Sequence, residues 1–203
     1  MRSENSPVSK AGELVLPSPT KANLIWRNST LRAILQILLL IGIGGVAAWA
    51  KSVSLPSGIP GSSGVLWVTP LVIGRMAVKK RGAGILMGIS TALWGVPLGL
   101  HNVLLYNSFL YGITGLALDL AAVFPFVNIT NPFGAIFCGI FSHLAKFGFI
   151  TEAAMLTGVT KKFIVFGLAR SGLLHVAFGA AAGFIAWFAY KGVQTWKDWR
   201  HHH

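Results

Sequence analysis

The sequence predicts an all-α membrane protein, a compact bundle of six transmembrane helices with both termini on the cytoplasmic side. Of its 203 residues, 54% are hydrophobic and only 11% are charged, and the mean hydropathy is +0.66. Soluble domains carry about 25% charged residues, and one core of this size could not bury so much apolar surface. The alternation of apolar and polar residues that marks a membrane β-barrel is absent, which leaves helices as the spanning elements.

Polar segments flank the predicted membrane domain. Residues 1–29 are expected to be a cytoplasmic tail and not a signal peptide. Residues 30–191 form the six-helix domain, and residues 192–203 form a cytoplasmic C-terminal tail. The last three residues are histidines that resemble a purification tag, so they are left out of the functional reasoning.

Six apolar runs are expected to be the helices, and they cover residues 31–50, 65–78, 82–100, 109–127, 133–150 and 163–190. The first has the roughly 20 residues that cross a ~30 Å hydrocarbon core. The second is short and contains Pro70 and Arg75, and the third contains Pro97. Residues 52–64 between the first two runs are rich in proline and glycine, which predicts a loop.

The distribution of basic residues predicts the orientation of the bundle in the membrane. With both termini inside, eleven Lys and Arg side chains fall on the cytoplasmic face and three on the outer face. Such an excess is typical of cytoplasmic segments, and it explains the formal charge of +12 without nucleic acid as a partner. The loop 52–64, the polar patch 101–108 and the turn 151–162 then share the outer face.

Polar side chains in the outer half of the bundle predict a ligand pocket, because ionisable residues in lipid are costly and are mostly functional or paired. Lys146 and Arg170 favour an anionic ligand such as a carboxylate or phosphate. Two of the polar residues also have a structural interpretation: Asp119 as the partner of Arg170 or His175 in a buried ion pair, and His143 as a packed core residue. The residues expected to bind the substrate are Trp67, Asn102, Tyr106, Asn107, His143, Lys146, Arg170 and His175.

Small residues at a spacing of four allow helices to approach closely in lipid. Gly84 and Gly88 in the third run lie beside the basic residues 79–81. Their spacing is compatible with packing inside the bundle and also with docking of another membrane subunit, for which these two glycines are the best candidates.

Catalytic and metal-binding motifs are missing from the sequence. It has no HExxH, GxSxG or GxxxxGK[ST] pattern, and its one cysteine has no Cys/His cluster around it. We therefore expect no metal, no cofactor and no enzymatic activity of the chain alone, and any ATP hydrolysis must come from a partner.

Two segments resemble the substrate-binding S components of energy-coupling factor (ECF) transporters. They are LPSGIPGSSGVLWVTPLVIGRMAVKKRGAGILMGISTALWG, which is similar to the second and third helices of that family, and YGITGLALDLAAVF, which is similar to its fourth. The resemblance implies a multi-pass subunit of a prokaryotic cell membrane that captures a vitamin or related micronutrient from outside. Its partners would be a transmembrane coupling subunit, two ATPase subunits and the lipid bilayer.

In that family the first outer loop closes over the substrate, a role that would fall here on Pro56, Gly58, Pro60 and Gly61. The residues themselves leave two other hypotheses open. One is a non-catalytic structural or assembly subunit of a membrane complex. The other is an intramembrane enzyme in which His143, His175 and Asp119 come within hydrogen-bonding reach of one another.

Overall fold

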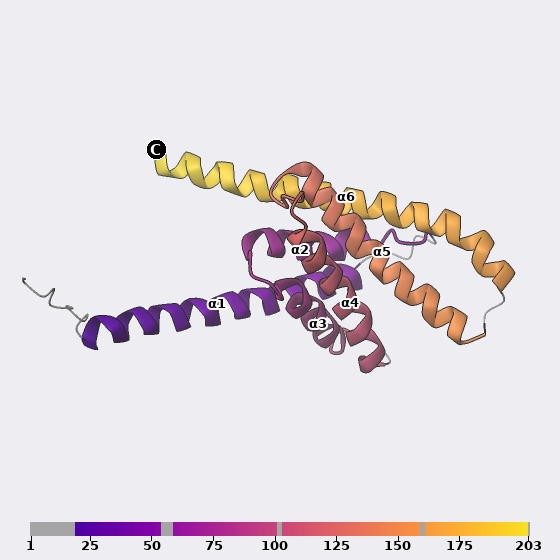
Figure 1. Cartoon of the computed structure of the whole chain (residues 1–203), viewed down its shortest axis with the longest axis horizontal. Coiled ribbons are helices and arrows are strands. Elements are labelled where there is room, and N and C mark those ends of the chain that lie inside the picture. The colour runs from indigo at the N-terminus through magenta and orange to yellow at the C-terminus, as the bar shows by residue number, and fades with distance from the viewer. Residues whose placement is uncertain (1–18, 54–58, 101–102, 159–160, 203) are drawn as a thin grey trace, which may run out of the picture. The chain divides into compact units, whose positions relative to one another are not determined.

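The computed structural model describes residues 19–53, 59–100, 103–158 and 161–202, which form six α-helices (Figure 1). Within this part of the chain, the predicted all-helical class and the number of helices are confirmed. Pro56, Gly58 and Asn102 lie outside the described residues. The helices are α1 (Pro19–Ser52), α2 (Gly64–Ala77), α3 (Ala83–Gly95), α4 (Leu104–Val123), α5 (Pro132–Leu156) and α6 (Lys161–His202).

The chain divides into two units, residues 1–35 and residues 36–203. In the first unit the structure describes only the N-terminal part of α1, from Pro19. This helix begins within the predicted tail 1–29, and α6 continues through the predicted tail 192–203 as far as His202. All packing described below belongs to the second unit.

Four of the helices are long and apolar enough to cross a membrane. These stretches are Asn28–Ser52, Leu104–Val123, Pro132–Leu156 and Gly167–Arg200. Helices α2 and α3 have only 14 and 13 residues, whereas a full crossing needs about 20. Helix α2 ends where Val78 adopts an extended conformation, just before the basic residues 79–81. Helix α3 ends at Gly95, shortly before Pro97.

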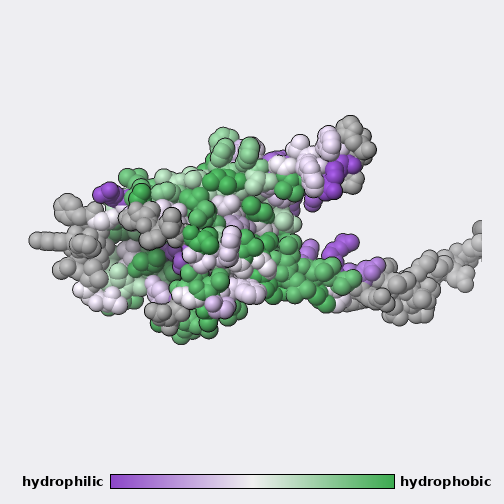
Figure 2. All heavy atoms as spheres, turned by 180° about the vertical axis from the view of Figure 1, so that it is seen from behind, coloured by the Kyte–Doolittle hydropathy of each residue, from purple (hydrophilic) through white to green (hydrophobic). Residues whose placement is uncertain are grey.

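Large hydrophobic side chains cover much of the outside of the molecule. Leu156 is 84% exposed, Phe133 81%, Leu173 71% and Leu105 69%. Figure 2 shows hydrophobic residues over much of one face, with strongly hydrophilic residues gathered at the C-terminal end of α6. An exposed apolar surface of this extent is unfavourable in water, and the structure is therefore that of a membrane protein.

Inside the bundle, α5 packs on α6, α4 packs on both α3 and α5, and α2 packs on α6 (Figure 1). Glycines form close contacts between α3 and α4 and between α5 and α6. A Cβ atom added to Gly84 or Gly88 would overlap the backbone carbonyl oxygens of Gly115 or Tyr111 in α4. The α5–α6 contact is built in the same way by Gly139, Gly179 and Gly183.

This packing corrects the docking role assigned to Gly84 and Gly88. Both residues are buried against α4 of the same chain, so they offer no face to another subunit. The internal alternative for their spacing is the one that the structure supports. The spacing alone could not decide between the two, because close approach to a helix of the same chain or of another protein needs the same small residues.

We expect Gly88→Ala to destabilise the protein by about 1–3 kcal/mol, the usual cost of overpacking, because it forces α3 away from α4. The control is Gly112→Ala on α4, where an added Cβ would meet only Ile89, at 3.8 Å. Unfolding by denaturing detergent measures both variants. Equal stabilities for the two variants would contradict the described α3–α4 contact.

Candidate ligand-binding site

Helices α1, α2, α4, α5 and α6 bring basic and aromatic side chains together at one end of the bundle. We call this group the basic–aromatic cluster. Its position corresponds to the C-terminal end of α1, the N-terminal end of α2 and the C-terminal half of α5, which is opposite to the basic turn 79–81. Its members are Lys51, Trp67, Tyr111, His143, Lys146 and His175.

An aromatic pair lies at the centre of the cluster. The rings of Trp67 and Tyr111 are completely buried and meet edge to face, with centroids 5.0 Å apart. The ammonium nitrogen of Lys146 lies 4.6 Å from the centroid of the Trp67 ring and 5.9 Å from that of Tyr111. Lys51 donates a hydrogen bond to the Tyr111 hydroxyl, and its nitrogen is 4.9 Å from the centroid of the same ring. Two cations therefore lie around one tyrosine.

Two histidines extend the cluster toward α6. The rings of His143 and His175 have centroids 5.1 Å apart, and the His175 ring also contacts Phe147 at 4.6 Å. The His175 Nδ1 atom lies 2.8 Å from the backbone oxygen of Ser171, four residues earlier in the same helix. His143 is only 1% exposed, and neither of its ring nitrogens has a hydrogen-bond partner among the described residues.

Unpaired buried polar atoms are rare because each costs the desolvation of a donor or acceptor. Besides the two nitrogens of His143, the indole Nε1 of Trp67 is buried without a hydrogen-bond partner in the part of the chain that the structure describes. The cluster thus holds three of these atoms, and Gln36 Oε1 and Trp187 Nε1, outside the cluster, are likewise buried without a partner among the described residues.

Glycines of the proline- and glycine-rich segment allow it to approach the two histidines. Gly61 has a φ of +84°, a conformation that favours glycine, and an added Cβ would lie 3.3 Å from the His175 ring. Gly64, the first residue of α2, lies so close to His143 that an added Cβ would overlap the imidazole. Of the predicted gating residues, Gly61 thus contacts the cluster, whereas Pro60 is exposed.

The structure separates Arg170 from the other predicted binding residues, and this corrects its placement in the pocket. Arg170 is exposed on α6, three residues before the 71% exposed Leu173. Five residues along a helix correspond to a rotation of about 140°, so Arg170 and His175 cannot both face the interior. Depth in the membrane, from which Arg170 was predicted, does not decide which way a side chain points.

Tyr106 and Asn107 also lie apart from the cluster as the structure describes it. Tyr106 is 39% exposed and packs on Phe149, with ring centroids 5.5 Å apart. The Asn107 side chain donates to the backbone oxygen of Val103 in the first turn of its own helix. Of the predicted binding residues, the structure brings together Trp67, His143, Lys146 and His175.

Asp119 forms a buried ion pair, but its partner is Arg75 and not Arg170 or His175. Arg75 Nε lies 2.8 Å from Asp119 Oδ1, and the second carboxylate oxygen accepts a hydrogen bond from the backbone N–H of Ile85. Arg75 also donates to the backbone oxygen of Val78. The pair joins the last turn of α2 to α4 and to the start of α3.

This pairing also bears on the hypothesis of an intramembrane enzyme. That hypothesis needs His143, His175 and Asp119 within hydrogen-bonding reach of one another. The two histidines are neighbours, but both oxygens of Asp119 are engaged by Arg75 and Ile85. No group of three or more potential metal ligands is found in the described part of the chain.

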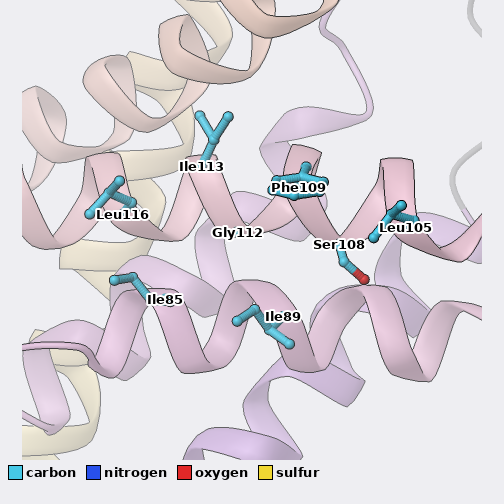
Figure 3. A pocket seen from close by; sticks show the side chains of 8 residues that line it. All are labelled: Ile85, Ile89, Leu105, Ser108, Phe109, Gly112, Ile113 and Leu116. Atoms are coloured by element: carbon cyan, nitrogen blue, oxygen red, sulfur yellow. The ribbon is translucent and has the colours of Figure 1, made fainter.

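A separate groove of about 330 Å³ runs between α3 and α4 (Figure 3). Of its eight lining residues, only Ser108 has a polar side chain, and the others are apolar residues such as Ile89 and Phe109. A groove of this kind suits lipid acyl chains. It lacks the convergent polar groups that orient a polar small molecule.

Two residues of the cluster were missed from the sequence, Lys51 and Tyr111, whereas Gly64 was expected only as the last residue of the loop 52–64. Lys51 stands at the end of the first apolar run, where a lysine commonly marks the membrane boundary, so it was counted only for orientation. Lys51 and Tyr111 are 60 residues apart in the sequence, so their contact could not be predicted from it.

Comparison with known proteins finds no matching family model, no similar curated protein and no similar solved structure.

Proposed function

We propose that this chain is a membrane subunit that binds a small molecule, with the basic–aromatic cluster as its binding site. One observation supports the proposal more than any other. Trp67 and His143 are buried between helices, and three of their polar atoms have no hydrogen-bond partner within residues 19–53, 59–100, 103–158 and 161–202. A protein that gained nothing from these groups would be more stable with apolar side chains in their place.

Within this proposal, the resemblance to S components of ECF-type importers supplies the role. The chain would cross the prokaryotic cell membrane with both termini inside, and α2 and α3 would complete a six-helix membrane domain with the four long helices. The cluster would then face outward, opposite to the basic turn 79–81, and would capture a vitamin-like molecule. A coupling subunit and two ATPases would drive its release to the cytoplasm.

Native mass spectrometry of the purified protein tests this proposal directly. We expect one small molecule to remain bound to a substantial fraction of the protein. We also expect the chain to co-purify with a co-expressed coupling subunit and ATPases of the ECF type. A protein that carries no small molecule and does not assemble with those subunits would instead be a structural subunit of another membrane complex.

The variant His143→Leu should lower the occupancy of the bound molecule at least tenfold while the protein stays folded. Leucine fills most of the space of the imidazole and leaves no hydrogen bond broken, because the ring makes none in the structure. Arg170→Gln is the matched control, since that side chain is exposed and its loss should leave occupancy unchanged. A greater loss with Arg170→Gln than with His143→Leu would contradict the site.

A further inference from the structure

The apolar groove between α3 and α4 has about the length of one lipid leaflet. Its lining extends along α4 from Leu105 to Leu116 (Figure 3), and this stretch of helix rises about 16 Å. One leaflet is half of the ~30 Å hydrocarbon core, or about 15 Å. The groove has a volume of about 330 Å³ and can therefore hold an acyl chain that lies along the helices, as the chains of a bilayer do.

A basic turn lies at one end of this groove. Helices α3 and α4 are antiparallel, since Gly84 contacts Gly115 and Gly88 contacts Tyr111. The turn of residues 79–81 leads directly into α3. The end of the groove that is formed by the start of α3 and the later part of α4 is consequently next to this turn.

The turn carries three positive charges at the surface. Lys79, Lys80 and Arg81 are exposed, and none of their side chains has an ion pair or a hydrogen bond with a described residue. Asp119, which lies at the same end of α4, is buried and already paired with Arg75. The turn is thus complementary to an anionic headgroup above the groove.

A transmembrane helix, from another protein or from a second copy of this chain, suits the groove less well. Helices associate in lipid through small residues that let their backbones approach closely. Most residues of the groove are large, and Ile89, Phe109 and Leu116 are exposed along it. A flexible acyl chain can pass between such side chains, whereas they would hold a second helix at a distance.

We infer that this groove binds an anionic phospholipid, with one acyl chain between α3 and α4 and the headgroup at the basic turn 79–81. The turn belongs to the predicted cytoplasmic face, and the cytoplasmic leaflet is the one whose lipids carry negative charge. The lipid site is separate from the basic–aromatic cluster, so it does not depend on the proposed capture of a small molecule.

Photo-crosslinking of the full-length protein in nanodiscs tests the inference. The probes are phosphatidylglycerol and phosphatidylcholine with the same diazirine-labelled acyl chains, each added as a minor component to unlabelled phosphatidylcholine. Peptide mass spectrometry then locates the labelled residues. We expect phosphatidylglycerol to label the groove, at residues such as Ile85 and Leu116, about tenfold more than phosphatidylcholine, because each Lys or Arg near the surface favours an anionic lipid about fivefold.

A second apolar hollow on the same molecule is an internal control. It has a volume of about 390 Å³ and is lined by Gly42, Gly45, Val46, Trp49, Trp94 and Leu98. This hollow lies at the C-terminal end of α3, about 20 Å from the basic turn, because the 13 residues of that helix separate them. Lys51, at the end of α1, donates its hydrogen bond to Tyr111 inside the bundle. Both probes should therefore label this hollow equally.

Charge variants connect the lipid preference to the turn. The triple variant Lys79→Gln, Lys80→Gln and Arg81→Gln should abolish the preference for phosphatidylglycerol in the groove and leave labelling by phosphatidylcholine unchanged. The matched control removes the same number of charges from exposed positions of α6, through Lys191→Gln, Lys197→Gln and Arg200→Gln. It should keep the preference of the wild type.

A further variant fills the groove. Gly112→Leu should lower the labelling by both probes, because the leucine side chain would occupy the space of the acyl chain. An added Cβ at Gly112 meets only Ile89, at 3.8 Å, so the packing of α3 on α4 should persist. An unfolding temperature equal to that of the wild type would verify that the variant is folded.

Several results would overturn the inference. These are equal labelling of the groove by the two probes, a preference that survives the triple variant of residues 79–81, and labelling that Gly112→Leu does not reduce. A disulfide between two copies of the variant Ile89→Cys in the membrane would show that a second copy covers the groove, and it would overturn the inference as well. Native mass spectrometry measures the bound small molecule independently, so none of these results bears on the proposed function.

Discussion

Replacing Asp119 with alanine is expected to destabilise the protein by about 3–5 kcal/mol, the usual cost of removing one partner of a buried ion pair. Arg75 is only 4% exposed, so its guanidinium would stay in the interior with its charge uncompensated. The backbone N–H of Ile85 would lose its acceptor as well, which loosens the start of α3. Unfolding in denaturing detergent measures the loss.

A double variant isolates the ion pair from the rest of the effect. Arg75→Met together with Asp119→Leu removes both charges, and such replacements are often neutral or even stabilising. We expect the double variant to recover most of the stability that Asp119→Ala loses. If Asp119→Ala unfolds like the wild type, the connection of α2 to α3 and α4 through this carboxylate is wrong.

Gly64→Ala is expected to affect both the stability of the protein and its binding. The added methyl group would overlap the imidazole of His143, so either that ring or the start of α2 must move. Overpacking of this kind costs about 1–3 kcal/mol. A displaced His143 should also lower the occupancy of the co-purified molecule at least tenfold, as native mass spectrometry would show.

Two further variants test whether this effect is steric. Gly148→Ala, in the exposed part of α5 where nothing lies within 4 Å of an added Cβ, should leave stability and binding unchanged. Combining Gly64→Ala with His143→Ala frees the space for the methyl group and should restore stability without restoring binding. Loss of binding in Gly148→Ala, or no loss in Gly64→Ala, would contradict the described contact.

The fold class could be predicted from the sequence because a segment that crosses lipid must be a long run of mostly apolar residues. Long apolar runs separated by prolines, glycines and charges indicate helices, and six helices are found in the described chain. The ends were predicted less well. Residues 192–202 contain three charged side chains and were expected to be a tail, yet α6 continues through them. Hydropathy indicates which residues suit the lipid phase, but it does not indicate at which residue a helix ends.

The site could be predicted only in part, for reasons of geometry. His143 and Lys146 are three residues apart, and helical periodicity alone places them on one face. The partners of Asp119 could not be found in this way. Its residue type and depth suggest a buried ion pair, but the choice of Arg75 over Arg170 depends on which helices are neighbours. Helix neighbours are set by packing at glycines such as Gly84, whose contacts do not show in a single sequence.

The shortness of α2 and α3 has a consequence for the bilayer in the proposed six-helix membrane domain. Their 14 and 13 residues rise about 21 and 20 Å, well short of a ~30 Å hydrocarbon layer. α3 nevertheless presents exposed apolar side chains, among them Leu93 and Trp94. If α3 faces lipid, as the proposed six-helix membrane domain requires, the acyl chains beside it must shorten or tilt to match its length, which is a hydrophobic mismatch. The protein should accordingly gather short-chain lipids along α3 and partition into the thinner regions of a mixed bilayer.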